Sequence, residues 1–153
     1  MTPAVPAEFA RHAWDFRDAA VAAENMLGER DEYLLGASLP VACLFGVSVE
    51  LALRSYILAM NPSSMHAADP HDSCDLQLLY DEASELGLVR LVRIDGYDLQ
   101  LLHWLGQLRW MQPSRYAGTS GNEIPPFDPM RKLCEKLLEV ACATAGYERV
   151  IYK

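Results

Sequence analysis

The chain has 153 residues, of which 51% are apolar, and a formal net charge of −8; this suits one domain with a substantial core rather than two. Residues 1–86 carry a net charge of −10, residues 87–116 carry +2, and the remainder is neutral. The balance excludes a protein that grips nucleic acid through an extensive basic surface, so any site for an anion must be local.

The N-terminal segment MTPAVPAEFARH lacks the basic start and apolar run of a secretion signal. Residues 33–49 carry no charge, but Glu50 and Arg54 follow where a membrane span would continue, which favours a buried helix of a soluble protein. The four cysteines form no C-x-x-C pair and are few for this length, so reduced, mostly buried thiols are expected. We therefore expect a cytoplasmic protein with no membrane association.

Two helices are predicted first along the chain. Phe9, Ala13, Phe16 and Ala20 recur at helical spacing, which predicts an amphipathic helix over residues 7–27 that ends at Gly28. Residues 39–60 are apolar nearly all round, with Pro40 acceptable in the first turn or as a kink. A helix of this composition is normally surrounded by other elements, so it is predicted to be the central helix of a bundle.

The central helix carries only two charged residues, Glu50 and Arg54. They stand four residues apart, so on a helix they share one face and each partly neutralises the other. We predict that Glu50 is a structural polar residue, and we place Arg54 among the candidates for binding a phosphate.

Residues 61–73, NPSSMHAADPHDS, are rich in turn formers and are predicted to be a loop. His66, Asp69, His71, Asp72 and Cys74 crowd into this region, and their side chains are all ligands of transition metals. Their spacing matches no geometry that holds three ligands tetrahedrally, so no metal site is predicted. The expected role is a solvated loop in which Asp72 or Ser73 caps the next helix.

The second half of the chain continues the helical pattern. A helix is predicted over residues 74–86 with Gly87 as its stop, and a connector over residues 88–94, whose strand-like composition has no second strand to pair with. Asp95 is predicted to cap a fourth helix, on which the lone His103 is expected to be structural. The fifth helix is predicted to open at Asp128 and Pro129 and to close at Gly146.

A long loop at residues 112–126 separates the last two helices, and loops of this length are mobile or functional. Near it, Arg109, Trp110, Arg115 and Tyr116 combine guanidinium groups with flat rings, a combination that binds phosphates and stacks bases. The alternative is that Trp110 packs in the core while Arg115 pairs with Glu50 or another acid. Arg54, Arg109, Arg115 and Tyr116 are the candidate nucleotide-binding or RNA-binding residues.

Together these elements predict a single all-α domain over residues 1–153, a four- to five-helix up-and-down bundle with its core at 7–146 and a tail at 147–153. The order of three signposts, SVELALRSYIL at 48–58, HDSCDLQLL at 71–79 and SRY at 114–116, resembles the HEPN-like helical domains. In that family the second helix carries a Glu three or four residues ahead of a basic residue, which here are Glu50 and Arg54.

The resemblance implies a helical bundle that forms a homodimer with a polar cleft near its two-fold interface. Active ribonucleases of the family use an Arg followed four to six residues later by a His, and no His of this chain stands at that distance after an Arg. The expected function is therefore binding of RNA or nucleotide without catalysis and without a cofactor. The alternatives are a protein-interaction or antitoxin-like dimeric module that uses apolar patches on helices one and five, and a divergent metal-independent ribonuclease that uses His103 or His71 as its base.

Overall fold

The computed structural model describes residues 5–69, 75–109 and 124–149, and within these ranges the chain forms helices and no strand. The long helices are α1 (Pro6–Leu27), α2 (Leu39–Met60) and α8 (Phe127–Ala145). The shorter helices are α4 (Leu76–Glu85) and α6 (Gly96–Arg109), and single helical turns form η1 (Asp31–Tyr33), α3 (Met65–Ala68) and α5 (Leu88–Leu91). The predicted all-α bundle is confirmed.

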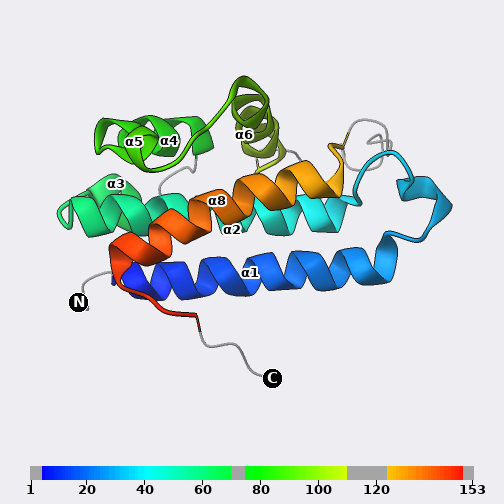
Figure 1. The fold of residues 1–153 in the computed structure, drawn as a ribbon, viewed down its shortest axis with the longest axis horizontal. Coiled ribbons are helices and arrows are strands. Elements are labelled where there is room, and N and C mark those ends of the chain that lie inside the picture. Colours follow the sequence, from blue (N-terminus) through cyan, green and yellow to red (C-terminus); the bar gives the residue numbers. More distant parts are fainter. Residues whose placement is uncertain (1–4, 70–74, 110–123, 150–153) are drawn as a thin grey trace.

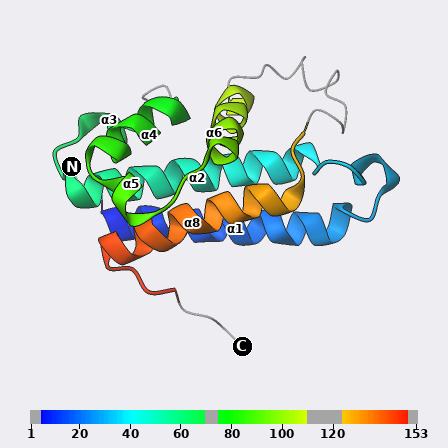
Figure 2. The same cartoon turned by 45° about the horizontal axis from the view of Figure 1, so that its top comes forward.

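The three long helices lie side by side, with α1 antiparallel to α2 and α8 running parallel to α2 (Figure 1). The shorter helices α4 and α6 pack against α2 and against each other. Helix α6 stands steeply to the long helices in both views (Figures 1 and 2). Of the long helices only α1 and α2 follow the predicted up-and-down course, because α8 runs parallel to α2 and α6 crosses the long helices.

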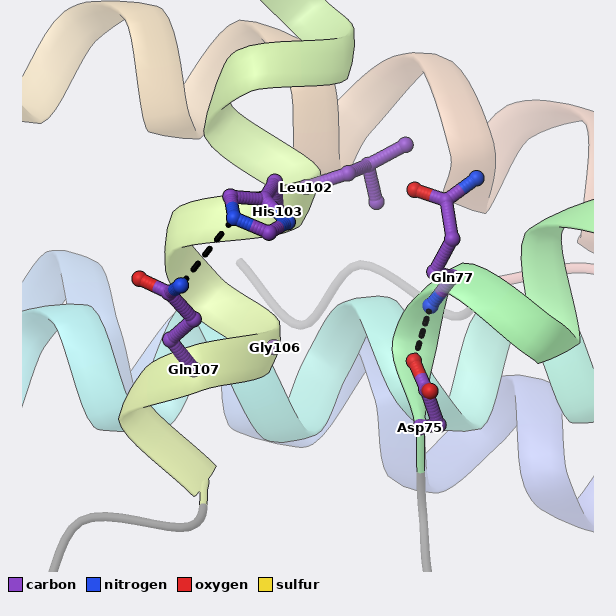
Figure 3. Close-up of a pocket in the computed structure, with 6 residues that line it drawn as sticks. All are labelled: Asp75, Gln77, Leu102, His103, Gly106 and Gln107. Atoms are coloured by element: carbon purple, nitrogen blue, oxygen red, sulfur yellow. Dashed lines mark hydrogen bonds between the residues drawn. The ribbon is translucent and has the colours of Figure 1, made fainter.

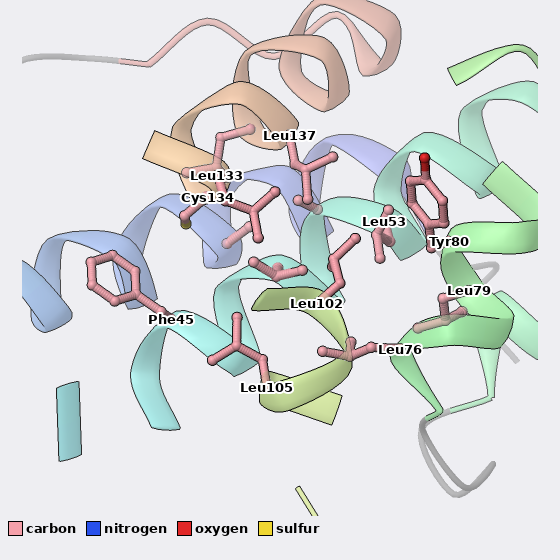
Figure 4. Packing of buried hydrophobic residues seen from close by; sticks show 14 of the residues in the cluster. Phe45, Leu53, Leu76, Leu79, Tyr80, Leu102, Leu105, Leu133, Cys134 and Leu137 are labelled. Atoms are coloured by element: carbon pink, nitrogen blue, oxygen red, sulfur yellow. The ribbon is translucent and has the colours of Figure 1, made fainter. Parts of the chain in front are cut away.

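Helix α2 is the central helix, with the bounds predicted for it. The Ser38 hydroxyl accepts a hydrogen bond from the Val41 N–H at its start, and Pro40 lies in the first turn, where a missing N–H costs nothing. Large side chains such as Phe45 and Leu53 are almost fully buried, among leucines from α4, α6 and α8 (Figure 4). Within the described ranges α2 is the one helix long and apolar enough to cross a membrane, but 78% of its most apolar window is buried in the bundle.

Small residues let α1 approach α2 closely. Ala10, Ala13 and Ala20 of α1 are fully buried, and the Ser48 hydroxyl of α2 donates a 2.6 Å hydrogen bond to the Ala13 carbonyl oxygen. The Ser48 oxygen also lies 3.1 Å from the Cys134 sulfur of α8, so one buried hydroxyl links three helices. Burial raises the pKa of the Cys134 thiol to about 12.

Two predicted helix ends are confirmed by the backbone itself. Gly87 (φ +98°) and Gly146 (φ +71°) both adopt the left-handed conformation that glycine accepts without strain. The helix predicted from about residue 74 begins at Leu76 in the structure, after its cap, Asp75. The Asp75 carboxylate accepts a 2.9 Å hydrogen bond from the Gln77 N–H, the role that the sequence assigned to Asp72 or Ser73.

Other local predictions also need correction. The loop predicted at 61–73 contains the helical turn α3, which Ser64 caps by accepting a hydrogen bond from the Ala67 N–H. The connector at 88–94 contains the turn α5, which the buried Leu88 anchors. A turn of four residues is too short to show helical periodicity in the sequence.

The described part of the tail lies against α1. The Arg149 guanidinium makes 2.7 and 2.8 Å hydrogen bonds to the Asp18 carboxylate and stacks 4.3 Å from the centre of the Trp14 ring. The indole N–H of Trp14 donates to the Cys142 sulfur at 2.8 Å. Ion pairing and a cation–π contact therefore hold residues 147–149 on the bundle.

Candidate functional site

A groove of about 310 Å³ lies between the start of α4 and the second half of α6. Its lining combines polar groups with an apolar floor: Asp75, Gln77, Leu102, His103, Gly106 and Gln107 (Figure 3). Small-molecule sites in proteins are typically concave, mostly apolar and fitted with a few polar groups, and this groove has that character.

His103 and Gln107 form the polar wall on α6. They stand one helical turn apart, and the Gln107 side-chain nitrogen lies 3.0 Å from Nε2 of His103. Both residues are exposed. An imidazole and an amide offer donors and acceptors at short range, the groups that recognise the edges of nucleobases.

The opposite wall comes from the first turn of α4, where Asp75 caps the helix and Gln77 follows (Figure 3). The side chain of Gln77 bonds Asp81 one turn further along. Gly106 of α6 faces this wall closely: a Cβ at this position would lie 3.5 Å from the Leu76 Cβ. Helix α6 thus packs against the start of α4 at Gly106, at the distance of an ordinary van der Waals contact.

The orientation of α6 is fixed at its N-terminus. The Asp95 carboxylate accepts a 2.8 Å hydrogen bond from the Asp98 N–H, and the Asp98 carboxylate accepts a 3.2 Å bond from the Asp95 N–H. This is a reciprocal capping box, and it confirms the predicted cap at Asp95. The hydrogen bond from the Asp98 N–H holds the pKa of Asp95 below its ordinary value.

Asp98 also connects α6 to α8. Its carboxylate is 2.9 Å from the Lys136 ammonium nitrogen, which in turn donates to the Arg93 carbonyl oxygen at 3.3 Å. Lys136 is therefore more than a solvated residue of α8, because its ammonium group lies at the start of α6. The pair fixes the end of α6 remote from the groove.

The predicted Glu50–Arg54 pair is present on α2. Arg54 Nε lies 3.1 Å from Glu50 Oε2, and the two side chains are only 3% and 12% exposed. Arg54 Nη1 also donates to three carbonyl oxygens of the 66–69 segment, those of His66, Ala67 and Asp69. A ligand would reach Arg54 only by displacing these carbonyl groups, and neither Glu50 nor Arg54 lines the groove. These surroundings favour a structural role for both.

A second polar cluster lies beside that segment. Glu82 of α4 accepts a 2.7 Å hydrogen bond from the Ser64 hydroxyl through one carboxylate oxygen, and its other oxygen lies 3.1 Å from His66 Nδ1. The two contacts join α3 to α4. Together with Arg54, they attach the 64–69 segment to the bundle from two sides.

Several predicted residues cannot be placed. Arg115 and Tyr116 lie outside the described residues, and Arg109 is the last residue of α6, of which only the backbone is described. His71, Asp72 and Cys74 of the metal-like region also lie outside the described residues. Among the described residues, no group of three His, Cys, Asp or Glu side chains is arranged to hold a metal ion.

The exposed apolar surface differs from the one expected for a protein-interaction module. Apart from Ala143, the apolar side chains of α8 are buried or partly buried, so helix five presents no large exposed hydrophobic residue. The most exposed ones near the end of α1 are Met26, Leu34 and Leu35, between 73% and 78% exposed. Of these, Met26 belongs to the end of α1, whereas Leu34 and Leu35 belong to the connection to α2.

Comparison of the chain with protein-family models, with curated proteins and with solved structures finds no match.

Sequence reasoning missed most of this groove. The sequence predicts a structural role for His103. It does not indicate a role for Gln77 or Gln107, because glutamine is common on helix surfaces. The spacing of His103 and Gln107 by four residues is the available signal, since such residues lie on one helix face. The opposite wall depends on how α4 packs against α6, and the sequence pattern does not reveal that packing.

Proposed function

We propose that this protein is a non-catalytic, HEPN-like binding module whose ligand is a nucleotide or single-stranded RNA held in the groove between α4 and α6. The observation that carries the proposal is the groove itself, with the His103–Gln107 pair on one wall and Asp75 and Gln77 on the other. The paired imidazole and amide suit the edge of a base.

The charge of the chain supports the same location. Helix α6 belongs to the 87–116 region, which carries a net +2 on an otherwise acidic protein. Arg109 ends α6 one turn after Gly106, and Arg115 and Tyr116 follow within seven residues in the chain. We assign the phosphate contacts to Arg109 and Arg115 and a stacking contact to Tyr116, while Glu50 and Arg54 keep the structural role described above.

Binding without cleavage is the expected chemistry. Cleavage of RNA by its 2′-hydroxyl requires a group that moves a proton as well as a cation for the phosphate. The Arg-to-His spacing of the active HEPN-like ribonucleases is absent from this sequence. Two groove residues, His103 and Asp75, are suited to proton transfer. The ribonuclease alternative uses His103 as its base, so the His103 variant separates that alternative from the proposal.

Fluorescence anisotropy with a labelled ten-nucleotide oligouridylate tests the binding. The wild type should bind the oligonucleotide at low salt. Its affinity should fall steeply as the salt concentration rises, because phosphate contacts release counterions. His103→Ala and Gln107→Ala should each weaken binding about fivefold, the usual effect of losing one neutral hydrogen bond. His12→Ala, which removes an exposed histidine of α1, is the matched control and should bind as the wild type does. Absence of binding at low salt would refute the proposal.

A gel assay on the same oligonucleotide tests catalysis. The RNA should remain intact with the wild type and with His103→Ala. Cleavage by the wild type that disappears in His103→Ala but persists in His12→Ala would instead establish the ribonuclease alternative.

We also propose that two copies of the chain associate, as the HEPN-like resemblance implies. Sedimentation equilibrium measures this directly. A mass near twice the 17.1 kDa of one chain is expected, and a monomer at micromolar concentration would contradict it.

A further inference from the structure

A second hollow, of about 270 Å³, lies at the C-terminal end of α1, where the connection to α2 meets the start of α8. Its lining is partly acidic and partly apolar: Glu24, Leu34, Leu35, Phe127 and Asp128 contribute, together with backbone of residues 36–37. A 3.1 Å hydrogen bond from the Ala37 N–H to the Pro125 carbonyl oxygen holds the two sides together. The connection projects from the end of the bundle, away from the start of α1 (Figure 1).

Glu24 is the unusual residue of this hollow. Its Oε2 atom is buried, and no hydrogen-bond donor contacts it among the described residues. Its carboxylate folds over Gly28, so that a Cβ at Gly28 would collide with it. Buried polar atoms in native proteins nearly always have partners, and a carboxylate oxygen without one is costly.

The surroundings of Glu24 increase that cost. Asp128 adds a second negative charge, and burial together with Asp128 raises the pKa of Glu24. Glu24 also stands in the last turn of α1, where the helix dipole is negative and where no basic residue of α1 stands. Asp128 has a cation nearby in Arg131, 3.2 Å away, whereas Glu24 has no ion pair with a described residue.

Beside this carboxylate the protein exposes two adjacent leucines. Leu34 and Leu35 are 73% and 78% exposed and line the same hollow. Contiguous exposed apolar side chains beside a hollow are typical of surfaces that bind another protein. The combination of an unpartnered acid and exposed leucines is complementary to a cation carried between apolar side chains.

We propose that this hollow is a docking site for a segment of another protein that presents an arginine or lysine between apolar residues. The cation pairs with Glu24, and the neighbouring apolar side chains cover Leu34 and Leu35. Other occupants fit less well, because nucleic acids and anionic membranes both carry the negative charge that Glu24, Asp128 and the −10 of residues 1–86 repel.

The probe is the peptide acetyl-Leu-Arg-Leu-Leu-amide, with acetyl-Leu-Gln-Leu-Leu-amide as its matched neutral control, titrated against the full chain and followed by NMR. The arginine peptide should bind and shift the methyl signals of Leu34 and Leu35, and it should bind about tenfold more tightly than the glutamine peptide, as expected for a charged hydrogen bond. Equal affinity of the two peptides, or no binding of either, would overturn the proposal.

Variants separate this site from general acidity. Glu24→Gln keeps the shape and removes the charge, so it should lose about tenfold in affinity for the arginine peptide. Glu139→Gln removes an exposed acid of α8 and should leave the affinity unchanged. Equal losses in both variants would mean that only overall charge attracts the peptide, and the site would be rejected.

Two further measurements keep the test decisive. Glu24→Gln should unfold at a higher temperature than the wild type when no peptide is present, because it removes an uncompensated charge, so lost binding cannot be ascribed to misfolding. Leu35→Ser should lower the affinity for the arginine peptide. It should leave the affinity for arginine amide unchanged, because arginine amide has no apolar side chains beside its cation. Arginine amide that binds as tightly as the peptide would identify a small cation as the occupant and refute docking of a protein segment.

Discussion

The Lys136 ammonium nitrogen of α8 lies 2.9 Å from the Asp98 Oδ2 atom of α6, and Asp98 is only 6% exposed. This contact joins the first turn of α6 to the long helix α8, although 38 residues separate Asp98 from Lys136 in the chain. Because the same carboxylate completes the capping box, one side chain fixes both the start of α6 and its position on the bundle.

Replacing Asp98 by alanine should therefore destabilise the protein by about 2 kcal/mol, since a cap and a charged hydrogen bond are lost together. Urea unfolding followed by circular dichroism measures the change. Asp81→Ala, at an exposed position of α4, is the control and should change stability by about 0.5 kcal/mol or less. Equal unfolding midpoints for Asp98→Ala and the wild type would show that the contact does not hold α6.

The stability of the protein should depend on the ionisation of Asp95, and therefore on pH. Its pKa is lowered in the folded protein, chiefly by the hydrogen bond from the Asp98 N–H, so the folded state prefers the ionised carboxylate. The contribution is fully present above the ordinary aspartate pKa of about 4 and is lost as the pH falls through the lowered value. The difference in urea midpoint between the wild type and Asp95→Asn should shrink from pH 6 to pH 2.5. A difference that stays constant with pH would contradict the assignment.

Glu50 should be required for stability. Glu50→Ala leaves the buried Arg54 without its carboxylate, which should cost about 3 kcal/mol, the order found when one partner of a buried pair is removed. Glu50→Gln keeps an acceptor and should cost less. A thermal melt of Glu50→Ala that coincides with that of the wild type would show that the three carbonyl groups around Arg54 suffice.

Cys134 should be inert in the folded protein. Its sulfur is fully buried and its pKa is raised to about 12 by burial, so almost no thiolate exists at pH 8. Iodoacetamide should label it only after unfolding, with a rate that follows the unfolding equilibrium as urea is added. Mass spectrometry of tryptic peptides gives that rate, and labelling of Cys134 in native conditions faster than global unfolding would refute the prediction.

The sequence predicted the long elements well because their signals are local. The bounds of α2 follow from a run of apolar residues with a serine before it, and the glycines at 87 and 146 mark helix ends because left-handed backbone favours glycine. The capping role of Asp95 was equally readable, since Asp98 stands three residues later.

The contacts between segments far apart in the chain could not be predicted from the sequence. The spacing of Glu50 and Arg54 predicts their pairing. Nothing in the pattern indicates that Arg54 also donates hydrogen bonds to three carbonyl oxygens of residues 66–69. His103 shows the same limit, because its partner Gln107 is local whereas the facing wall comes from α4. Tertiary packing decides both.

The central position of α2 has a consequence for how the molecule opens. Its backbone amides are covered by α1 and α8 along one side and by α4 and α6 along the other, so we expect them to be the slowest to exchange with deuterium. Helices α4 and α6 pack on α2 as an outer group, and we expect them to open before the three long helices separate. We therefore expect the amides in the walls of the groove to exchange before those of α2.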